Sequence, residues 1–171
     1  MSDLGVQPDE GWRTAVIRDF AASELFDRTF REGMDLVEET ALYLDGAGRQ
    51  ESKRLSRKAA LAYASESMRL TTRLMQLASW LLVQRAVREG QMAPAEACNE
   101  RYRMVEELSK PGEPAELLPE GLNSLLERAS RLHERVAHLD RRMYVEPAPD
   151  ADNHPVLTQL DRLQAVFGRR A

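Results

Sequence analysis

The residues from Glu51 to Glu89 include neither glycine nor proline, which leaves 39 positions without a residue that breaks helices. A helix of that length would extend about 58 Å. Along it, apolar residues recur at alternating steps of three and four, which is the period of one helix face. The series is Leu55, Ala59, Ala62, Glu66, Leu70, Leu74, Leu77 and Leu81, with Glu66 as its one charged member.

A second apolar series follows the same period on the adjoining face of this helix. It comprises Leu61, Ala64, Met68, Met75, Ala78 and Leu82. One neighbouring helix cannot cover both faces, so we expect this helix to contact at least two partners. The chain is therefore predicted to be an all-α protein built around residues 51–89.

Three further helices are predicted around this one. The first begins at Ser23, a good N-cap, and ends at Gly46. Gly33 inside it costs about 1 kcal/mol relative to alanine, which indicates close approach of another helix. A third helix is predicted from Pro94 to Ser109 and a fourth from Leu122 to Val145. Because the first connection is short, we expect an antiparallel helical bundle of three long helices plus a shorter fourth, with a flexible C-terminal tail.

The two ends of the chain differ from the bundle in composition. Residues 1–18 read as a loose lead-in, and residues 19–145 as the bundle. Residues 146–155, with the sequence EPAPDADNHP, predict a disordered linker. Residues 156–171 predict a short amphipathic docking segment, because its apolar residues have the spacing of a helix that lies in a groove. We expect it to bind a partner through Val156, Leu160, Leu163 and Phe167, with Arg162 beside them. The alternatives are that it folds back on its own bundle or that it stays disordered.

Charge and cysteine content exclude several classes of function. The net charge of −4 gives no general attraction to DNA, RNA or an anionic membrane surface. Residues 1–12 have neither the basic nor the apolar region of a signal peptide, and no apolar run is long enough to span a membrane. The single cysteine, Cys98, fits a reducing compartment. We therefore expect a cytoplasmic protein that binds neither nucleic acid nor membrane.

No pattern of residues predicts a catalytic or metal site. His133 and His138 are five positions apart and project in different directions from a helix, so they do not share a metal; His133 is expected to be partly buried and His138 solvent-facing. The basic cluster Lys53, Arg54, Arg57 and Lys58 has acidic residues of the first helix to neutralise it. No phosphate-binding loop or nucleophile motif is present. We expect a protein without cofactors and without enzymatic activity.

Glu66 and the methionines each allow two interpretations. Glu66 either pairs with a nearby arginine or lies at the edge of its face, or it fixes the register of a helix pair across a dimer. The methionines at helical spacing either fill the core, which is the default, or form an adaptable binding face. They are Met68, Met75, Met92, Met104 and Met143.

Long stretches of the bundle resemble a known family. These include ELFDRTFREGMDLVEETALYLD (24–45), LMQLASWLLVQRAVREG (74–90), NERYRMVEEL (99–108) and LLERASRLHERVAHLDRRMY (125–144). They resemble the RcdA family, the alphaproteobacterial regulators of CtrA degradation, over roughly Phe20 to Tyr144. The resemblance covers the whole domain and assigns no function to individual residues.

The resemblance implies a cytoplasmic accessory protein, recruited to a cell pole, that helps deliver cell-cycle regulators such as CtrA to the ClpXP protease. CpdR and PopA would be its partners, and a homodimer with a mobile C-terminal tail would be its form. A protein of this kind acts by tethering, because a short linker raises the effective concentration of cargo near the protease. The alternative is a structural dimerisation or scaffold protein with no role in substrate delivery.

Overall fold

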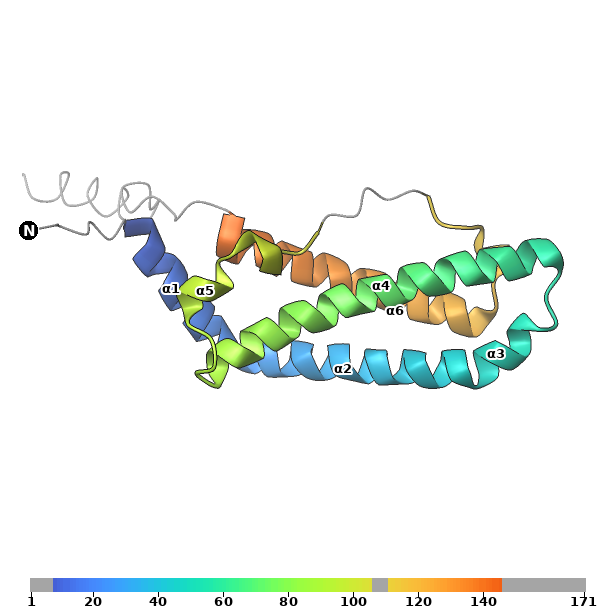
Figure 1. Ribbon diagram of the computed structural model, residues 1–171, viewed down its shortest axis with the longest axis horizontal. Coiled ribbons are helices and arrows are strands. Elements are labelled where there is room, and N and C mark those ends of the chain that lie inside the picture. Colours follow the sequence, from blue (N-terminus) through green and yellow to red (C-terminus); the bar gives the residue numbers. More distant parts are fainter. Residues whose placement is uncertain (1–7, 106–110, 146–171) are drawn as a thin grey trace, which may run out of the picture.

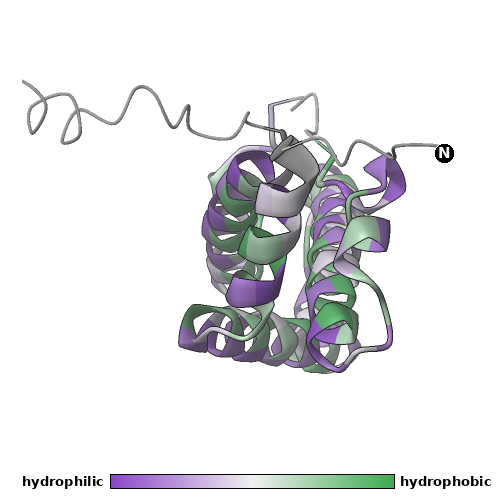
Figure 2. Cartoon of the chain, turned by 90° about the vertical axis from the view of Figure 1, so that its left-hand side faces the viewer, coloured by the Kyte–Doolittle hydropathy of each residue, from purple (hydrophilic) through white to green (hydrophobic). Residues whose placement is uncertain are grey.

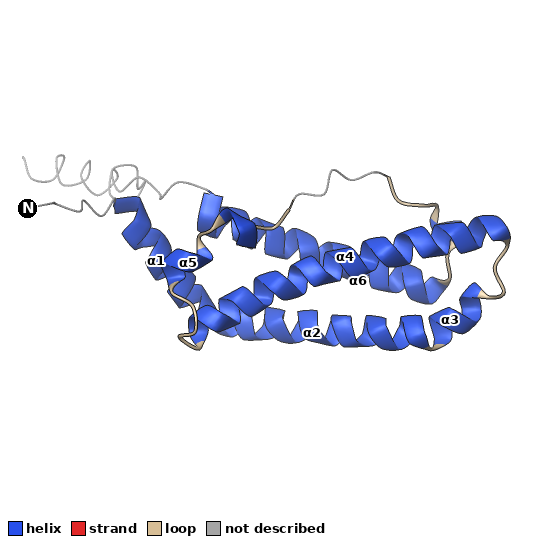
Figure 3. Ribbon diagram, in the orientation of Figure 1, coloured by secondary structure: helices blue, strands red, loops and turns tan. Residues whose placement is uncertain are grey.

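The computed structural model describes residues 8–105 and 111–145, and this part of the chain is helical, with no strand. Figures 1 and 3 show the helices. In chain order they are α1 (Pro8–Ala21), α2 (Glu24–Asp45), α3 (Ala47–Ser52), α4 (Arg57–Arg88), α5 (Pro94–Ala97) and α6 (Glu120–Asp140), with the short turns η1 (Glu100–Tyr102), η2 (Ala115–Leu117) and η3 (Arg141–Val145). Within the described ranges, no helix has the length and apolar character needed to cross a membrane.

Three long helices, α2, α4 and α6, lie side by side and form the body of the molecule (Figure 1). Figure 2 looks at this body from the end that carries α1 and shows the helices around a common interior. The helix α4 runs back along α2 and packs against both α2 and α6. The predicted antiparallel all-α bundle is therefore confirmed.

The core lies along the first predicted face of α4. Leu70, Leu74, Leu77 and Leu81 are buried there, together with Ala62 and Glu66. The predicted close approach at Gly33 is confirmed, since a Cβ atom on that residue would lie 2.5 Å from Leu81 Cδ1. At this crossing, α2 and α4 approach more closely than a side chain at position 33 would allow.

The prediction of one helix over residues 51–89 is wrong at its N-terminal end. The chain forms α3, leaves helical geometry between Lys53 and Ser56, and begins α4 at Arg57. Ser56 is the N-cap, and its side chain accepts a hydrogen bond from the Ala59 N–H at 3.2 Å. A serine side chain that accepts a hydrogen bond from a free N–H group can begin a new helix even where no glycine or proline interrupts the previous one.

The prediction of a loose N-terminal lead-in is wrong from Pro8 onward, where α1 begins. The helix packs against α4 at the end of the body. Ile17 and Ala21, one turn apart, are almost completely buried. Arg13 donates a hydrogen bond to the Tyr144 carbonyl, which ties α1 to the end of η3. The short fourth helix of the bundle is thus the N-terminal one.

The prediction of a helix from Pro94 to Ser109 is also wrong. The helix α5 ends at Ala97, the turn η1 follows, and Arg103 has extended backbone. Residues 106–110 lie outside the described part. The backbone N–H of Met104 donates to Asp140 Oδ2 at 3.2 Å instead of continuing a helix. A buried partner on α6 has replaced the helical hydrogen bond.

Candidate interaction surface

The middle of α4 presents an uncharged surface to the outside of the bundle. We call it the α4 face and define it as the exposed positions between Leu61 and Leu82, all within the described part of the chain. They are Leu61, Ala64, Ser65, Met68, Thr71, Thr72, Met75, Ser79 and Leu82. None of these nine residues carries a charge.

The charged residues of this part of α4 point elsewhere. Glu66 is 3% exposed, its Oε1 accepts the Glu113 N–H at 3.0 Å, and it lies 3.5 Å from Arg69 Nη1. Arg73 donates to Ser130 Oγ on α6 at 2.6 Å. Because these side chains make contacts within the bundle, the opposite side of the helix is left without charge.

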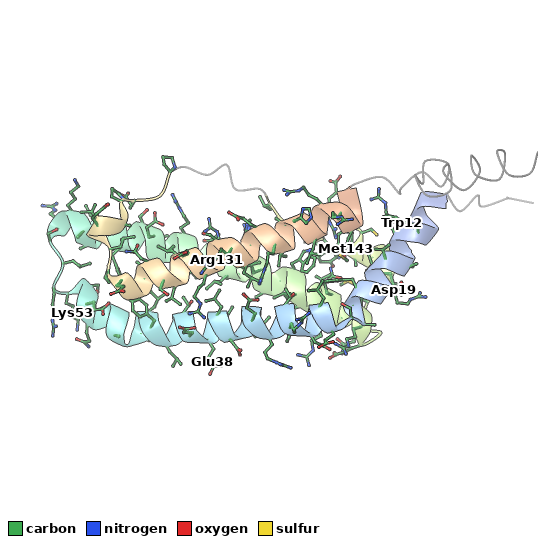
Figure 4. All side chains as sticks on the ribbon, turned by 180° about the vertical axis from the view of Figure 1, so that it is seen from behind. Trp12, Asp19, Glu38, Lys53, Arg131 and Met143 are labelled. Carbon is green, nitrogen blue, oxygen red and sulfur yellow. The ribbon has the colours of Figure 1, made fainter. Side chains whose placement is uncertain are left out.

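The outer side of α2 is quite different. Eight of its eleven exposed residues are charged. Two of them form ion pairs with α6: Glu39 with Arg128, at 2.6 and 2.8 Å, and Glu32 with Arg135. The Arg128 guanidinium lowers the pKa of Glu39 below its ordinary value. Figure 4 labels Glu38, another charged residue of α2, and Arg131 on the neighbouring α6. A solvated surface has this composition, and the α4 face does not.

Four large apolar side chains define the α4 face, at intervals of seven residues. Leu61, Met68, Met75 and Leu82 are 67%, 73%, 66% and 52% exposed. Side chains seven residues apart lie in a line along a helix, and this spacing is typical of a helix that packs against another helix. Contiguous exposed apolar side chains of this kind mark interaction sites. We therefore take the α4 face as the candidate interaction surface.

A groove adjoins the C-terminal half of this face. It has a volume of about 490 Å³ and lies between α4 and residues 101–105. Met75 and Val83 line one wall, and Arg101, Arg103 and Val105 line the other. Val105 is 61% exposed, so the groove has exposed apolar side chains on both sides.

A buried polar network builds the second wall of the groove. Asp140 on α6 is 3% exposed; its Oδ1 accepts the Trp80 indole N–H at 2.7 Å and lies 3.2 Å from Arg103 Nη1. Its Oδ2 accepts the Met104 N–H. One carboxylate thus fixes both a core tryptophan and the chain segment that runs beside α4.

Tyr144 extends this network to the end of the described chain. Its ring lies under the Arg103 guanidinium, and its hydroxyl accepts a hydrogen bond from Gln84 Nε2 at 2.6 Å. Burial raises the pKa of the tyrosine. The described chain therefore leaves the bundle beside the groove wall.

The residues predicted from sequence as a docking site, Val156, Leu160, Arg162, Leu163 and Phe167, lie outside the described residues, and their role stays a prediction. The pairing of Glu66 with a nearby arginine is confirmed. His133 is half-buried and His138 exposed, as predicted. Within the described ranges, no group of three or more His, Cys, Asp or Glu residues is placed to hold a metal ion.

Two further predictions are corrected by the structure. Core filling, the default interpretation of the methionines, is wrong for Met68 and Met75, which are exposed on the α4 face. The cluster Lys53, Arg54, Arg57 and Lys58 is exposed where the chain turns between α3 and α4. Figure 4 shows Lys53 at the end of the bundle opposite Trp12. Lys53 and Arg54 lie on this turn, and Arg57 and Lys58 are the first two residues of α4; none of the four forms an ion pair with α2 in the part that the structure describes.

Comparisons with known proteins place the chain in a family. A family model described as "Protein of unknown function (DUF1465)" matches residues 17–167. No match is found among curated proteins. Among solved structures, RcdA from Caulobacter crescentus CB15 is 68% identical, with a TM-score of 0.63, over 75% of this chain and 98% of that one. The chain therefore belongs to the DUF1465 family and is similar over most of its length to RcdA of Caulobacter crescentus.

Proposed function

We propose that the chain is a non-enzymatic adaptor that helps deliver cell-cycle regulators such as CtrA to the ClpXP protease, together with CpdR and PopA. The observation that supports this proposal most is the 68% identity to an RcdA protein over nearly all of that protein's length. The proposal places the chain in the cytoplasm, with recruitment to a cell pole. It assigns the chain no reaction, because tethering requires only binding surfaces.

The α4 face gives such an adaptor a surface for partners. Methionine side chains are flexible and polarisable, so Met68 and Met75 can adapt to more than one partner helix. The absence of charge among its nine exposed residues means that no unpaired charge is buried when a partner covers the face. The same composition suits several different proteins better than one highly specific partner.

We further propose that the chain forms a homodimer through this face. The order Leu61, Met68, Met75, Leu82 reads the same in both directions. An antiparallel second copy related by a two-fold axis would therefore place leucine against leucine and methionine against methionine. A two-fold interface requires this kind of self-complementary surface.

The C-terminal segment is proposed as the mobile arm of the adaptor. Its apolar stripe, Val156, Leu160, Leu163 and Phe167, is separated from the bundle by ten residues that include no lysine or arginine. A linker of this length gives an effective concentration of the order of millimolar between arm and bundle partners. Weak contacts at each site would then add to a strong tether.

A reconstituted degradation reaction tests the proposal. CtrA is incubated with ClpXP, CpdR, PopA and ATP, with and without the chain, and its loss is followed over time. An adaptor accelerates the loss of CtrA, whereas a scaffold protein, the alternative function, leaves the rate unchanged.

The arm is tested in the same reaction with full-length variants. Leu163→Glu with Phe167→Glu disrupts the apolar stripe and is expected to reduce delivery. Thr158→Glu with Ala165→Glu adds the same charge off the stripe and serves as the matched control. Equal rates for the two variants would refute the role of the arm.

A further inference from the structure

The groove between α4 and residues 101–105 has exposed apolar side chains on both walls, two arginines on one of them, and no occupant among the described residues. Met75 on α4 and Val105 on the opposite wall are 66% and 61% exposed. Ser79 and Val83, on the α4 wall, carry no charge. A groove of this kind accepts the apolar side of a short peptide segment, as grooves for amphipathic helices do.

The chain itself supplies a segment close to this groove. The last described residue is Val145, and Tyr144 before it lies under Arg103, which lines the groove. Ten residues lie between Val145 and Val156, so eleven chain steps connect the two. These steps reach at most about 36 Å when extended, and a flexible chain of this length has an end-to-end distance of about 18 Å. The apolar stripe that begins at Val156 is therefore within reach of the groove.

The connecting residues and the groove also have complementary charges. Residues 146–155 carry three acidic residues and no lysine or arginine. Arg101 and Arg103 lie on the groove wall, and Arg142 is exposed in the turn that precedes the linker. Arg103 is paired with Asp140, so the exposed Arg101 and Arg142 are the groups that an acidic linker would meet, and their charge is complementary to it.

The length of the segment fits the groove as well. Its four apolar residues, Val156, Leu160, Leu163 and Phe167, extend over about 16 Å if helical. The stretch of α4 from Thr72 to Val83, whose ends both line the groove, is about 16 Å long by the same measure. The apolar stripe and the α4 wall of the groove therefore match in length.

We propose that the segment Val156–Phe167 occupies the groove between α4 and residues 101–105 of its own chain when no partner is bound. This contact goes beyond the proposed delivery function and does not depend on it. The effective concentration of the segment is about 1 mM. An intrinsic dissociation constant of about 0.1 mM then gives a ratio of docked to undocked segment of roughly ten. The docked segment would cover Met75 and leave Leu61 exposed.

Hydrogen exchange in the full-length chain, read by mass spectrometry, tests the proposal. Amides of residues 157–167 are expected to exchange about tenfold more slowly than in an isolated peptide of the same sequence. Met75→Glu with Val105→Glu places two charges in the groove and is expected to abolish this protection. Both residues are exposed, and an unchanged helical circular dichroism signal confirms that the variant is folded.

Leu42→Glu is the matched control, because it charges an exposed apolar position on α2, outside both the groove and the α4 face. It is expected to leave the protection of residues 157–167 unchanged. Equal loss of protection in both variants would overturn the proposal, and so would exchange of the segment at the peptide rate in the unmodified chain. Protection that falls on tenfold dilution would mean docking on a second copy and would overturn it too. None of these results depends on degradation of CtrA. The delivery function is therefore tested independently of the docking contact.

Discussion

Asp140 connects three elements of the molecule, and replacing it tests whether the polar network holds them together. In Asp140→Asn, one carboxylate oxygen becomes an amide that donates hydrogen bonds. Either the Trp80 N–H or the Met104 N–H then faces another donor, whichever way the amide is turned. Arg103 also loses the negative charge that lies 3.2 Å from it.

The expected cost follows from these losses. A buried donor left without an acceptor costs about 1–3 kcal/mol, and removing one partner of a buried ion pair costs about 3–5 kcal/mol. The Arg103 side chain is 15% exposed, so water partly compensates its loss. We therefore expect Asp140→Asn to lower the free energy of unfolding by about 3 kcal/mol, near the lower end of the ion-pair range.

Urea denaturation followed by circular dichroism measures this change. The control is Asp45→Asn, which removes an exposed carboxylate at the end of α2 and should change stability by less than about 0.5 kcal/mol. Hydrogen exchange of the Met104 amide should also become faster in Asp140→Asn. A stability within 0.5 kcal/mol of the unmodified chain, by the same surface criterion, would refute the role given to the network.

Three further changes test the packing, the ion pairs and the helix start. Gly33→Ala should destabilise the chain by about 1 kcal/mol in thermal unfolding. The reason is that overpacking against Leu81 costs about 1–3 kcal/mol, which exceeds the gain in helix propensity. Gly11→Ala, in open space on α1, is the control and should stabilise the chain instead. Glu39→Gln should cost at most about 1 kcal/mol at pH 7, because the pair with Arg128 is exposed. Because the folded-state pKa of Glu39 is lowered, the stability contributed by its ion pair is present above the ordinary pKa of 4.5 and is lost as the pH falls below that value. In urea titrations, the stability difference between the variant and the unmodified chain should therefore be seen at pH 7 and disappear at pH 3. Ser56→Ala should cost about 1 kcal/mol in urea denaturation, whereas Ser56→Gly should cost a few tenths.

The helix periodicity was enough to predict the bundle, because α2, α4 and α6 each bury one face and the sequence repeats that face every three or four residues. Gly33 was a second reliable signal, since glycine inside a helix is unfavourable unless a neighbour requires it. Both signals are local in the sequence and need no knowledge of the partner.

The errors arose where a distant residue decides the local structure. Nothing near Met104 in the sequence indicates that its N–H bonds to Asp140 on α6, and this contact replaces the predicted helix. Ser56 as an N-cap was visible in the sequence, but the surrounding residues are compatible with a continuous helix. The start of α1 depends on its packing against α4 and on the hydrogen bond from Arg13 to the Tyr144 carbonyl, 131 residues away in the sequence.

The candidate surface was visible only in part. The series Leu61, Met68, Met75 and Leu82 was recognised as apolar, but periodicity does not distinguish a face that packs inside the chain from one left for a partner. The additional signal was that the exposed positions beside the series carry no charge. This signal is present in the sequence. Only the positions of α2 and α6 show that this face is left uncovered by the bundle.

The most direct test of the central claim, that partners bind the α4 face, is the rate of CtrA loss in the reconstituted ClpXP reaction with a variant of that face. Leu61→Glu with Met68→Glu places two charges on the face outside the groove, and Leu42→Glu, on α2 and 69% exposed, is the control. We predict that the double variant retains its helical circular dichroism signal and no longer accelerates CtrA loss, while Leu42→Glu acts like the unmodified chain. Delivery by the double variant at the unmodified rate would contradict the account.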